Sequence, residues 1–190
     1  MALKPPVEVP QGAIRFNTDS QKLEFFAQDQ WWEMATYVGS DNTGGIRGLF
    51  YRGYVGPTNS NVIDYITMSS AGNAVDFGDA LTDARQAGAT GSNTRAVVVG
   101  RNSANNTIEY VTFASAGDAA DFGDSTANRA GAPSAVSNGT RGIFAGGSNP
   151  YINSMEYVTI ATTGNAKDFG DLTVVRMLYS GTSDSHGGIS

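Results

Sequence analysis

Residues 155–171 read MEYVTIATTGNAKDFGD, and this stretch decides the fold because it occurs three times. Residues 63–79 read IDYITMSSAGNAVDFGD, and residues 108–124 read IEYVTFASAGDAADFGD, so the copies begin 45 and 47 residues apart. A fixed period of this size is typical of arrays and propellers, in which each repeat packs against the next. The sequence therefore predicts three tandem repeats.

The first six residues of each copy predict a β-strand that has neighbours on both faces. Side chains two positions apart share one face of a strand. In the second copy, one face carries Ile108, Tyr110 and Thr112, and the other carries Glu109, Val111 and Phe113. Neither face is fully polar, and the other copies show the same pattern. We therefore expect each small sheet to be packed between two others.

Arginines recur around the three copies. One set opens each repeat before a short apolar run (Arg47, Arg95 and Arg141), and a second set follows each Asp-Phe-Gly-Asp (Arg85, Arg129 and Arg176). Each repeat then supplies about four short strands: the opening strand, the acidic-Tyr strand, the strand entering Asp-Phe-Gly-Asp, and a strand after the second Arg. Four strands per repeat of this length is the unit of a β-propeller. We expect an all-β fold with three propeller-type blades at about 43–91, 92–138 and 139–185, plus the start of a further strand.

The repeats resemble the kelch-like repeats of virion and tail-associated proteins of marine bacteriophages. The shared pattern is Thr-Arg-Gly-aliphatic-Phe-Ala-Gly-Gly, Glu-Tyr-Val-Thr-Ile and Asn-Ala-x-Asp-Phe-Gly-Asp-Leu-Thr, and residues 140–173 match it best. The first two copies depart from it, with Tyr51-Arg52 and Val99-Gly100 where the third has Ala145-Gly146. The resemblance implies a non-catalytic virion structural protein in a tail fibre, tail tip or capsid decoration.

Residues 1–40 precede the repeats and predict a small β-hairpin or meander, with strands at 12–16, 22–26 and 31–34 separated by a turn at 17–20. The Gly-x-Ile-Arg-Phe-Asn-Thr…Leu-Glu-Phe…Trp pattern resembles a module of phage tail-fibre proteins, which implies a role in attachment or oligomerisation. The alternative is that its aromatic side chains cover the open face of the first repeat. The candidate assembly contacts are Phe16, Phe25, Trp31 and Trp32.

Charge and composition exclude several classes of partner. The chain has 12 basic and 18 acidic residues, a net charge of −6 and no run of Lys or Arg. Nucleic-acid binding requires clustered positive charge, so we expect none. The sequence has no Cys, no apolar run of the roughly 20 residues needed to span a bilayer, and no signal-peptide pattern at its start. We expect no membrane insertion, and the resemblance to virion proteins implies a location in the extracellular virion particle.

Asp-Phe-Gly is also a metal-binding motif of protein kinases, but this chain lacks the Gly-rich phosphate loop and the His-Arg-Asp loop that kinases require. We expect no enzymatic activity and no cofactor. A packing role explains the motif better, with Phe77, Phe122 and Phe169 wedged between blades and Tyr65, Tyr110 and Tyr157 as structural partners. The two Asp residues of each motif leave Ca²⁺ binding open, since hard cations take carboxylate oxygens from loops.

The remaining candidates concern ligands and partners. Tyr51, Tyr54 and Tyr151 stand among Gly, Asn and Pro residues, where exposed aromatic rings can stack on sugars. A glycan-binding adhesin that recognises the host surface is therefore the alternative function. The single histidine, His186, offers little for a catalytic relay or a metal site.

Three blades do not close a propeller of four to eight blades, and an open sheet edge invites pairing with another chain. We expect a homo-oligomer, either two chains in a six-bladed ring or three chains joined through the N-terminal module. Other virion proteins are the expected further partners.

Overall fold

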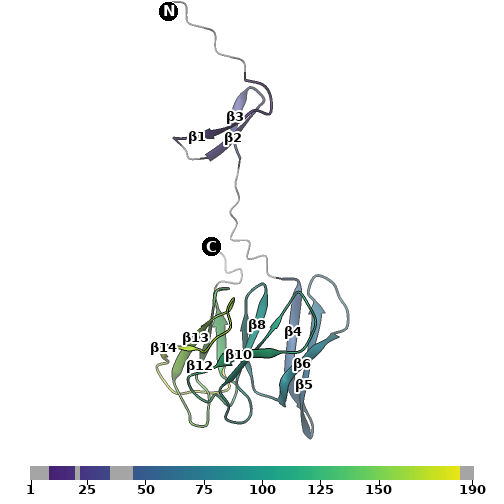
Figure 1. Cartoon of the computed structure of the whole chain (residues 1–190), viewed down its shortest axis with the longest axis vertical. Helices are drawn as coiled ribbons and strands as arrows, with labels where there is room; N and C mark the ends of the chain where they lie inside the picture. The colour runs from purple at the N-terminus through teal and green to yellow at the C-terminus, as the bar shows by residue number, and fades with distance from the viewer. Residues whose placement is uncertain (1–8, 20–21, 35–44, 185–190) are drawn as a thin grey trace, which may run out of the picture. The chain divides into compact units, whose positions relative to one another are not determined.

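The computed structural model of the chain describes residues 9–19, 22–34 and 45–184. The chain divides into two compact units, residues 1–41 and 42–190. All regular structure in the described residues is β-structure, with fourteen strands in four antiparallel sheets and no helix (Figure 1). The prediction of an all-β chain is confirmed.

The first unit contains one antiparallel sheet in the order β1-β2-β3. Its strands are β1 (Ile14–Asn17), β2 (Lys22–Ala27) and β3 (Gln30–Glu33), close to the expected meander. Gln28 and Asp29 connect β2 to β3 and have φ values of 52° and 58°. Positive φ at both central residues is the geometry of the two-residue hairpin turn whose twist matches that of the flanking strands.

The second unit contains three sheets that lie side by side in chain order (Figure 1). The first repeat sheet contains β4 (Arg47–Val55), β5 (Thr58–Thr67) and β6 (Val75–Ala84). The second repeat sheet contains β7 (Gly88–Gly91), β8 (Arg95–Val99), β9 (Thr107–Thr112) and β10 (Ala120–Asp124). The third repeat sheet contains β11 (Ser134–Ser137), β12 (Arg141–Ala145), β13 (Ser154–Thr159) and β14 (Lys167–Asp171). In each sheet, strands that follow one another in sequence are hydrogen-bonded neighbours.

The sheets are offset in phase from the expected repeats. The strand after the second Arg was assigned to the repeat that it follows, but β7 pairs with β8 and β11 pairs with β12. Each of these strands therefore opens the next sheet. The second and third repeat sheets have four strands each, and the first has three described strands, with residues 35–44 before β4 lying outside the described residues. A period fixes the length of a repeat but not its starting point. The short hairpin turn at residues 92–94 decides the phase by returning β7 onto β8.

Two faces recur in the three repeat sheets, because side chains alternate along each strand. The tyrosine face contains Tyr65, Tyr110 and Tyr157 in the three sheets, and the acidic face contains Asp64, Glu109 and Glu156. Residues of the opening strands share these faces. Val97 lies opposite Tyr110, and Val98 lies opposite Glu109. Among the described residues, the prediction that the central strands have neighbours on both faces is met in full only by the second sheet.

The core lies between neighbouring repeat sheets. One buried cluster joins Val97, Val99, Ile108 and Phe122 of the second sheet to residues of the third: Phe144, Val158, Ile160 and Ala166. The other joins Ile63, Phe77 and Ala80 of the first sheet to residues of the second: Ala96, Val111 and Ala119. In both clusters, the tyrosine face of one sheet packs against the acidic face of the next. The direction of packing is therefore the same at each contact.

Candidate functional site: the contacts between repeats

The Asp-Phe-Gly-Asp motif forms hydrogen bonds to the following repeat. The backbone N–H groups of Gly117 and Ala119 donate to the carbonyl oxygens of Phe77 and Asp79, at 2.7 and 2.8 Å. In return, the backbone N–H of Asp79 donates to Oδ1 of Asp118 at 3.0 Å. The motif of the first repeat is thus joined to the small-residue loop of the second.

The same three hydrogen bonds recur between the second and third repeats. The N–H groups of Gly164 and Ala166 donate to the carbonyl oxygens of Phe122 and Asp124, again at 2.7 and 2.8 Å. The N–H of Asp124 donates to Oδ1 of Asn165 at 3.0 Å. Asp and Asn serve equally here because only a side-chain oxygen acceptor is needed.

The central glycine of the motif permits this close approach. Gly78 and Gly123 have φ values of 146° and 141°, in a region that side chains disfavour. A Cβ atom on Gly78 would lie 2.4 Å from the backbone of Gly117, and one on Gly123 would lie 2.6 Å from Gly164. The equivalent Gly170 has only a side-chain carbon of Met155 nearby, at 3.9 Å. The steric requirement for glycine therefore comes from the next repeat.

The phenylalanines of the motif pack edge-on against the tyrosines of the same sheet. The ring centroids are 5.9, 5.7 and 6.1 Å apart in the pairs Tyr65–Phe77, Tyr110–Phe122 and Tyr157–Phe169. Phe77 and Phe122 are each 2% exposed, because the following sheet covers them, whereas Phe169 is 46% exposed. The ring pairs themselves are formed within one repeat and do not depend on a neighbour.

Buried carboxylates on the acidic face receive donors from the preceding repeat. Glu156 and Arg129 are fully buried and form an ion pair, with Arg129 Nε donating to Glu156 Oε1 at 2.6 Å. The N–H and hydroxyl of Thr126 both donate to Glu156 Oε2 at 2.7 Å. Arg129 also donates to the carbonyl oxygens of Gly146 and Ser154. The charges are thus paired and hydrogen-bonded on all sides, as burial requires.

Glu109 has a different cation for a partner. It accepts a hydrogen bond from the N–H of Leu81 at 2.8 Å, as Glu156 does from Thr126, but it forms an ion pair with Arg52. Arg52 lies at a β-bulge in β4 with φ of 58°, at the position where the first repeat departs from the shared pattern. Burial lowers the pKa of Arg52 to about 10, so it remains charged at neutral pH. The sequence pattern did not predict this pair, because Gly146, the counterpart of Arg52 in the third repeat, has no side chain.

The opening arginines stack on the tyrosines and extend to the next repeat. The guanidinium carbons of Arg47, Arg95 and Arg141 lie 5.3, 4.8 and 4.9 Å from the ring centres of the tyrosines on the same sheet. Arg95 donates to the carbonyl oxygens of Ile160 and Ala161 at 3.2 and 2.8 Å, and Arg47 donates to that of Phe113.

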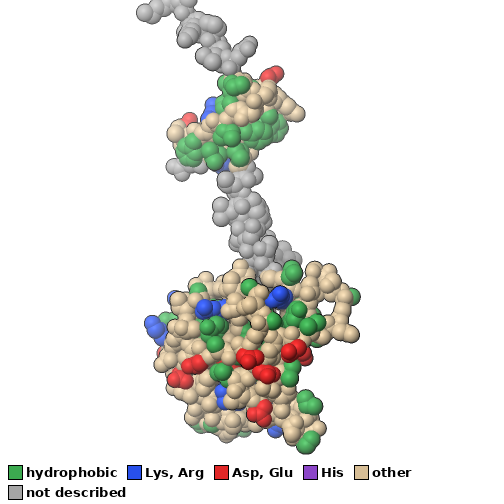
Figure 2. All heavy atoms as spheres, turned by 45° about the vertical axis from the view of Figure 1, so that its right-hand side comes forward, with side chains coloured by type: hydrophobic (Ala, Val, Ile, Leu, Met, Phe, Trp, Pro, Cys, Tyr) green, Lys and Arg blue, Asp and Glu red, His purple; other side chains and the backbone are tan. Residues whose placement is uncertain are grey.

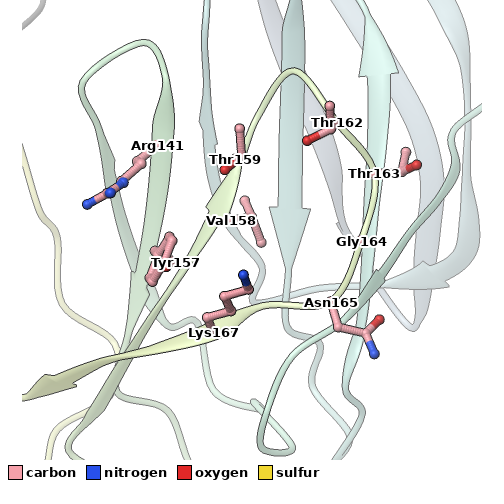
Figure 3. Close-up of a pocket in the computed structure, with 9 residues that line it drawn as sticks. All are labelled: Arg141, Tyr157, Val158, Thr159, Thr162, Thr163, Gly164, Asn165 and Lys167. Carbon is pink, nitrogen blue, oxygen red and sulfur yellow. The ribbon is translucent and has the colours of Figure 1, made fainter.

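Arg141 lies instead at the margin of a hollow of about 380 Å³ on the third repeat sheet (Figure 3). Tyr157 and Lys167 come from β13 and β14, and Thr162 and Asn165 come from the loop between these strands (Figure 3). Most of the lining side chains end in a hydroxyl, an amide or a cation. The hollow therefore suits a polar ligand or a polar protein surface.

The three tyrosines proposed as sugar contacts are not brought together in one site. Tyr51 and Tyr54 were expected in loops, but both lie in β4. The hydroxyl of Tyr51 is buried and has no hydrogen-bond partner among the described residues, and burial raises its pKa well above the ordinary value of 10. Tyr54 is exposed and stacks against Arg85 at 4.6 Å, and Tyr151 is exposed in a turn. The structure therefore leaves Tyr54 and Tyr151 as exposed aromatic rings.

The first unit has one charged face and one apolar face. On the charged face, Arg15 donates to Glu24 at 2.7 Å and lies 4.1 Å from the ring centre of Trp31. Hydrogen bonds from Asn17 and Arg15 hold the pKa of Glu24 below its ordinary value of 4.5. Trp31 also packs edge-on against Phe26. Of the four expected assembly contacts, Trp31 thus lies away from the other three.

The apolar face of the first unit is exposed (Figure 2). Strand pairing places Phe16 opposite Leu23, and Phe25 between Ile14 and Trp32. All of these side chains, together with Met34, are exposed in the unit. Patches of apolar side chains that remain exposed in a soluble domain commonly mark an interaction surface.

Other chemistry is sparse in the described ranges. No three His, Asp or Glu side chains in them come together as metal ligands, so Ca²⁺ binding by the motif gains no support. Among the same residues, no helix has the length and apolarity needed to cross a bilayer. His186 lies outside the described residues. A scan against protein-family models finds no match, and neither does a search of curated protein sequences.

Proposed function

We propose that this chain is a non-catalytic structural protein of a bacteriophage virion, with three propeller-type blades that act by assembly and surface contact in a tail fibre, a tail tip or a capsid decoration. The observation that carries the non-catalytic role is the use of the recurring polar groups. Glu109, Glu156, Arg95 and Arg129 are all engaged in contacts between repeats. Groups fixed in this way hold neighbouring sheets in register rather than reacting with a substrate.

The virion location rests on the resemblance of the repeats and of the first unit to phage proteins. The amphipathic sheet of that unit supports an attachment role, because its apolar face is too exposed for a sheet that functions alone. A three-stranded sheet of this size also gains stability when it packs on another surface. We propose that the apolar face binds another virion protein.

Purified phage particles test this function. Quantitative mass spectrometry of gradient-purified particles should find the protein at a fixed copy number, and immunogold labelling should localise it to one part of the particle. Phe16→Ser on the apolar face should reduce incorporation, whereas Lys22→Gln on the opposite face should not. Intact particles that lack the protein would overturn the proposal.

A glycan-binding adhesin is the second candidate. It is favoured by the polar hollow bordered by Arg141 and by the exposed rings of Tyr54 and Tyr151. A glycan array probed with the full chain tests it. Binding that is lost in Tyr151→Ala or Tyr54→Ala would support the adhesin, and no signal on any glycan would exclude it.

A further inference from the structure

The two ends of the repeat array expose the same faces that neighbouring repeats cover elsewhere. At one end lies the acidic face of the first repeat sheet. Met68 is 61% exposed there, whereas the equivalent Ile160 is fully buried. Phe50 and Ala74 are also exposed on this sheet, whereas their third-sheet equivalents Phe144 and Ala166 are buried. In the described structure, no sheet covers this face.

At the other end lies the tyrosine face of the third repeat sheet. Phe169 is exposed, and Gly170 keeps its positive φ of 129° without the close neighbour that Gly78 and Gly123 have. The inter-repeat hydrogen bonds formed by the first two motifs have no counterpart at Phe169 and Asp171 in the described residues. This end therefore presents the acceptor atoms that the small-residue loop of another repeat would use.

The charges at the two ends are complementary. Arg176 occupies the position of Arg129 and is exposed, and Asp64 occupies the position of its partner Glu156. Arg141 corresponds to Arg95, which donates to the carbonyl of Ile160. Because Met68 is the equivalent of Ile160, its carbonyl is the matching acceptor. If the first repeat sheet of one chain packed on the third repeat sheet of another, Asp64 would thus pair with Arg176, and the carbonyl of Met68 would accept a hydrogen bond from Arg141.

The strands at the two ends are also complementary. The first repeat sheet has three described strands, and β4 is one of the two edges of this described sheet. At the other end, Gly181–Ser183 lie beside β11, and Ser183 Oγ donates to the carbonyl of Ser137 at 2.7 Å. Ser137 Oγ makes the same bond, at 2.7 Å, to Gly91 of β7. Residues 181–183 therefore occupy the opening-strand position of a further sheet.

We infer that a second copy of this chain docks head to tail, with its first repeat sheet on the third repeat sheet of its partner. This inference rests on the assembly role proposed above and names the partner. Within the chain, the tyrosine face of each repeat sheet packs against the acidic face of the next. One end of the array exposes an acidic face and the other end exposes a tyrosine face, so the two ends can form the same contact. An interface that joins two different surface patches of identical chains produces a closed ring when the rotation from one chain to the next permits closure. Among multiples of three, only six falls within the four to eight blades of a typical propeller, so two copies form the ring.

Two variants, each blocking one end, test the docking. Met68→Arg places a charge on the acidic face of the first sheet, and Phe169→Asp places one on the tyrosine face of the third. Both side chains are exposed in the single chain, so each variant should fold. Val55→Asp changes an exposed apolar residue at the β4–β5 hairpin and serves as the control. Light scattering after size-exclusion chromatography measures the mass, and circular dichroism checks the fold.

The wild type and Val55→Asp should have twice the chain mass of 19.9 kDa. Each end-blocked variant should be a monomer, and an equimolar mixture of the two should recover the dimer, because each contributes one intact end. A monomeric wild type, a mixture that stays monomeric, or a single variant that remains dimeric would each overturn head-to-tail docking. None of these results would remove the protein from purified particles, so the proposed virion location is tested separately.

Discussion

The stability contributions of Phe122 and Phe169 should differ, although both occupy the same place in the motif. Phe122 is 2% exposed and lies between two sheets, whereas Phe169 is 46% exposed. Replacing a buried phenylalanine by alanine costs about 3–5 kcal/mol of unfolding free energy. We expect Phe122→Ala to lose about that amount, and Phe169→Ala to lose about 1–2 kcal/mol because roughly half of its ring area is already in water.

Urea unfolding followed by circular dichroism measures both values at a protein concentration low enough to dissociate the proposed dimer. The two variants remove the same atoms and the same edge-on contact with a tyrosine, so their difference reports the covering sheet. At high protein concentration, where the proposed second copy would cover Phe169, the loss in Phe169→Ala should increase. Equal losses for the two variants at low concentration would refute the assignment of the sheet contacts.

Three further perturbations follow from the described contacts. Gly123→Ala should destabilise the chain more than Gly170→Ala. Both substitutions place alanine at a positive φ, but only the Cβ atom at position 123 clashes with backbone atoms of the chain. Equal losses of stability in thermal unfolding would argue against this. Glu156→Gln should cost about 3–5 kcal/mol in urea unfolding by leaving Arg129 buried without a counter-charge, and a loss below about 1 kcal/mol would contradict the ion pair. The lowered pKa of Glu24 stabilises the first unit above pH 4.5, and this contribution should disappear as pH falls through the lowered pKa. The only two tryptophans lie in that unit, so their fluorescence should report the acid transition, and Glu24→Gln should reduce its pH dependence.

The sequence predicted the architecture more reliably than the contacts. The three copies of Asp-Phe-Gly-Asp and the alternating central strands were sufficient to predict an all-β chain of small repeated sheets. They did not predict to which sheet β7 belongs, because a hairpin turn, and not the repeat period, decides whether β7 pairs with the following strand β8 or joins the preceding sheet. Arg52 was missed as the partner of Glu109, because a bulge breaks the correspondence between repeats exactly where the side chain is redirected.

Loop positions were also predicted poorly. Tyr51 and Tyr54 follow glycine-rich sequence, yet β4 continues through both, and the hydroxyl of Tyr51 becomes buried. The acceptor role of Asp118 and Asn165 had a detectable signal, since Asn or Asp occurs at this position in all three copies. The interpretation of that signal required the structure, because it depends on which loop meets which motif.

The contact between two copies is tested most directly by engineered cysteines, since the chain has none of its own. Asp124 and Asn165 are joined by a hydrogen bond between repeats, and Asp171 and Asn73 are the equivalent positions at the two ends. Asp124→Cys with Asn165→Cys in one chain should form an internal disulfide and serves as the geometric control.

A mixture of Asn73→Cys and Asp171→Cys chains should then give a disulfide-linked heterodimer on a non-reducing gel, whereas neither variant alone should cross-link. A mixture that stays monomeric while the control forms its disulfide would contradict head-to-tail assembly.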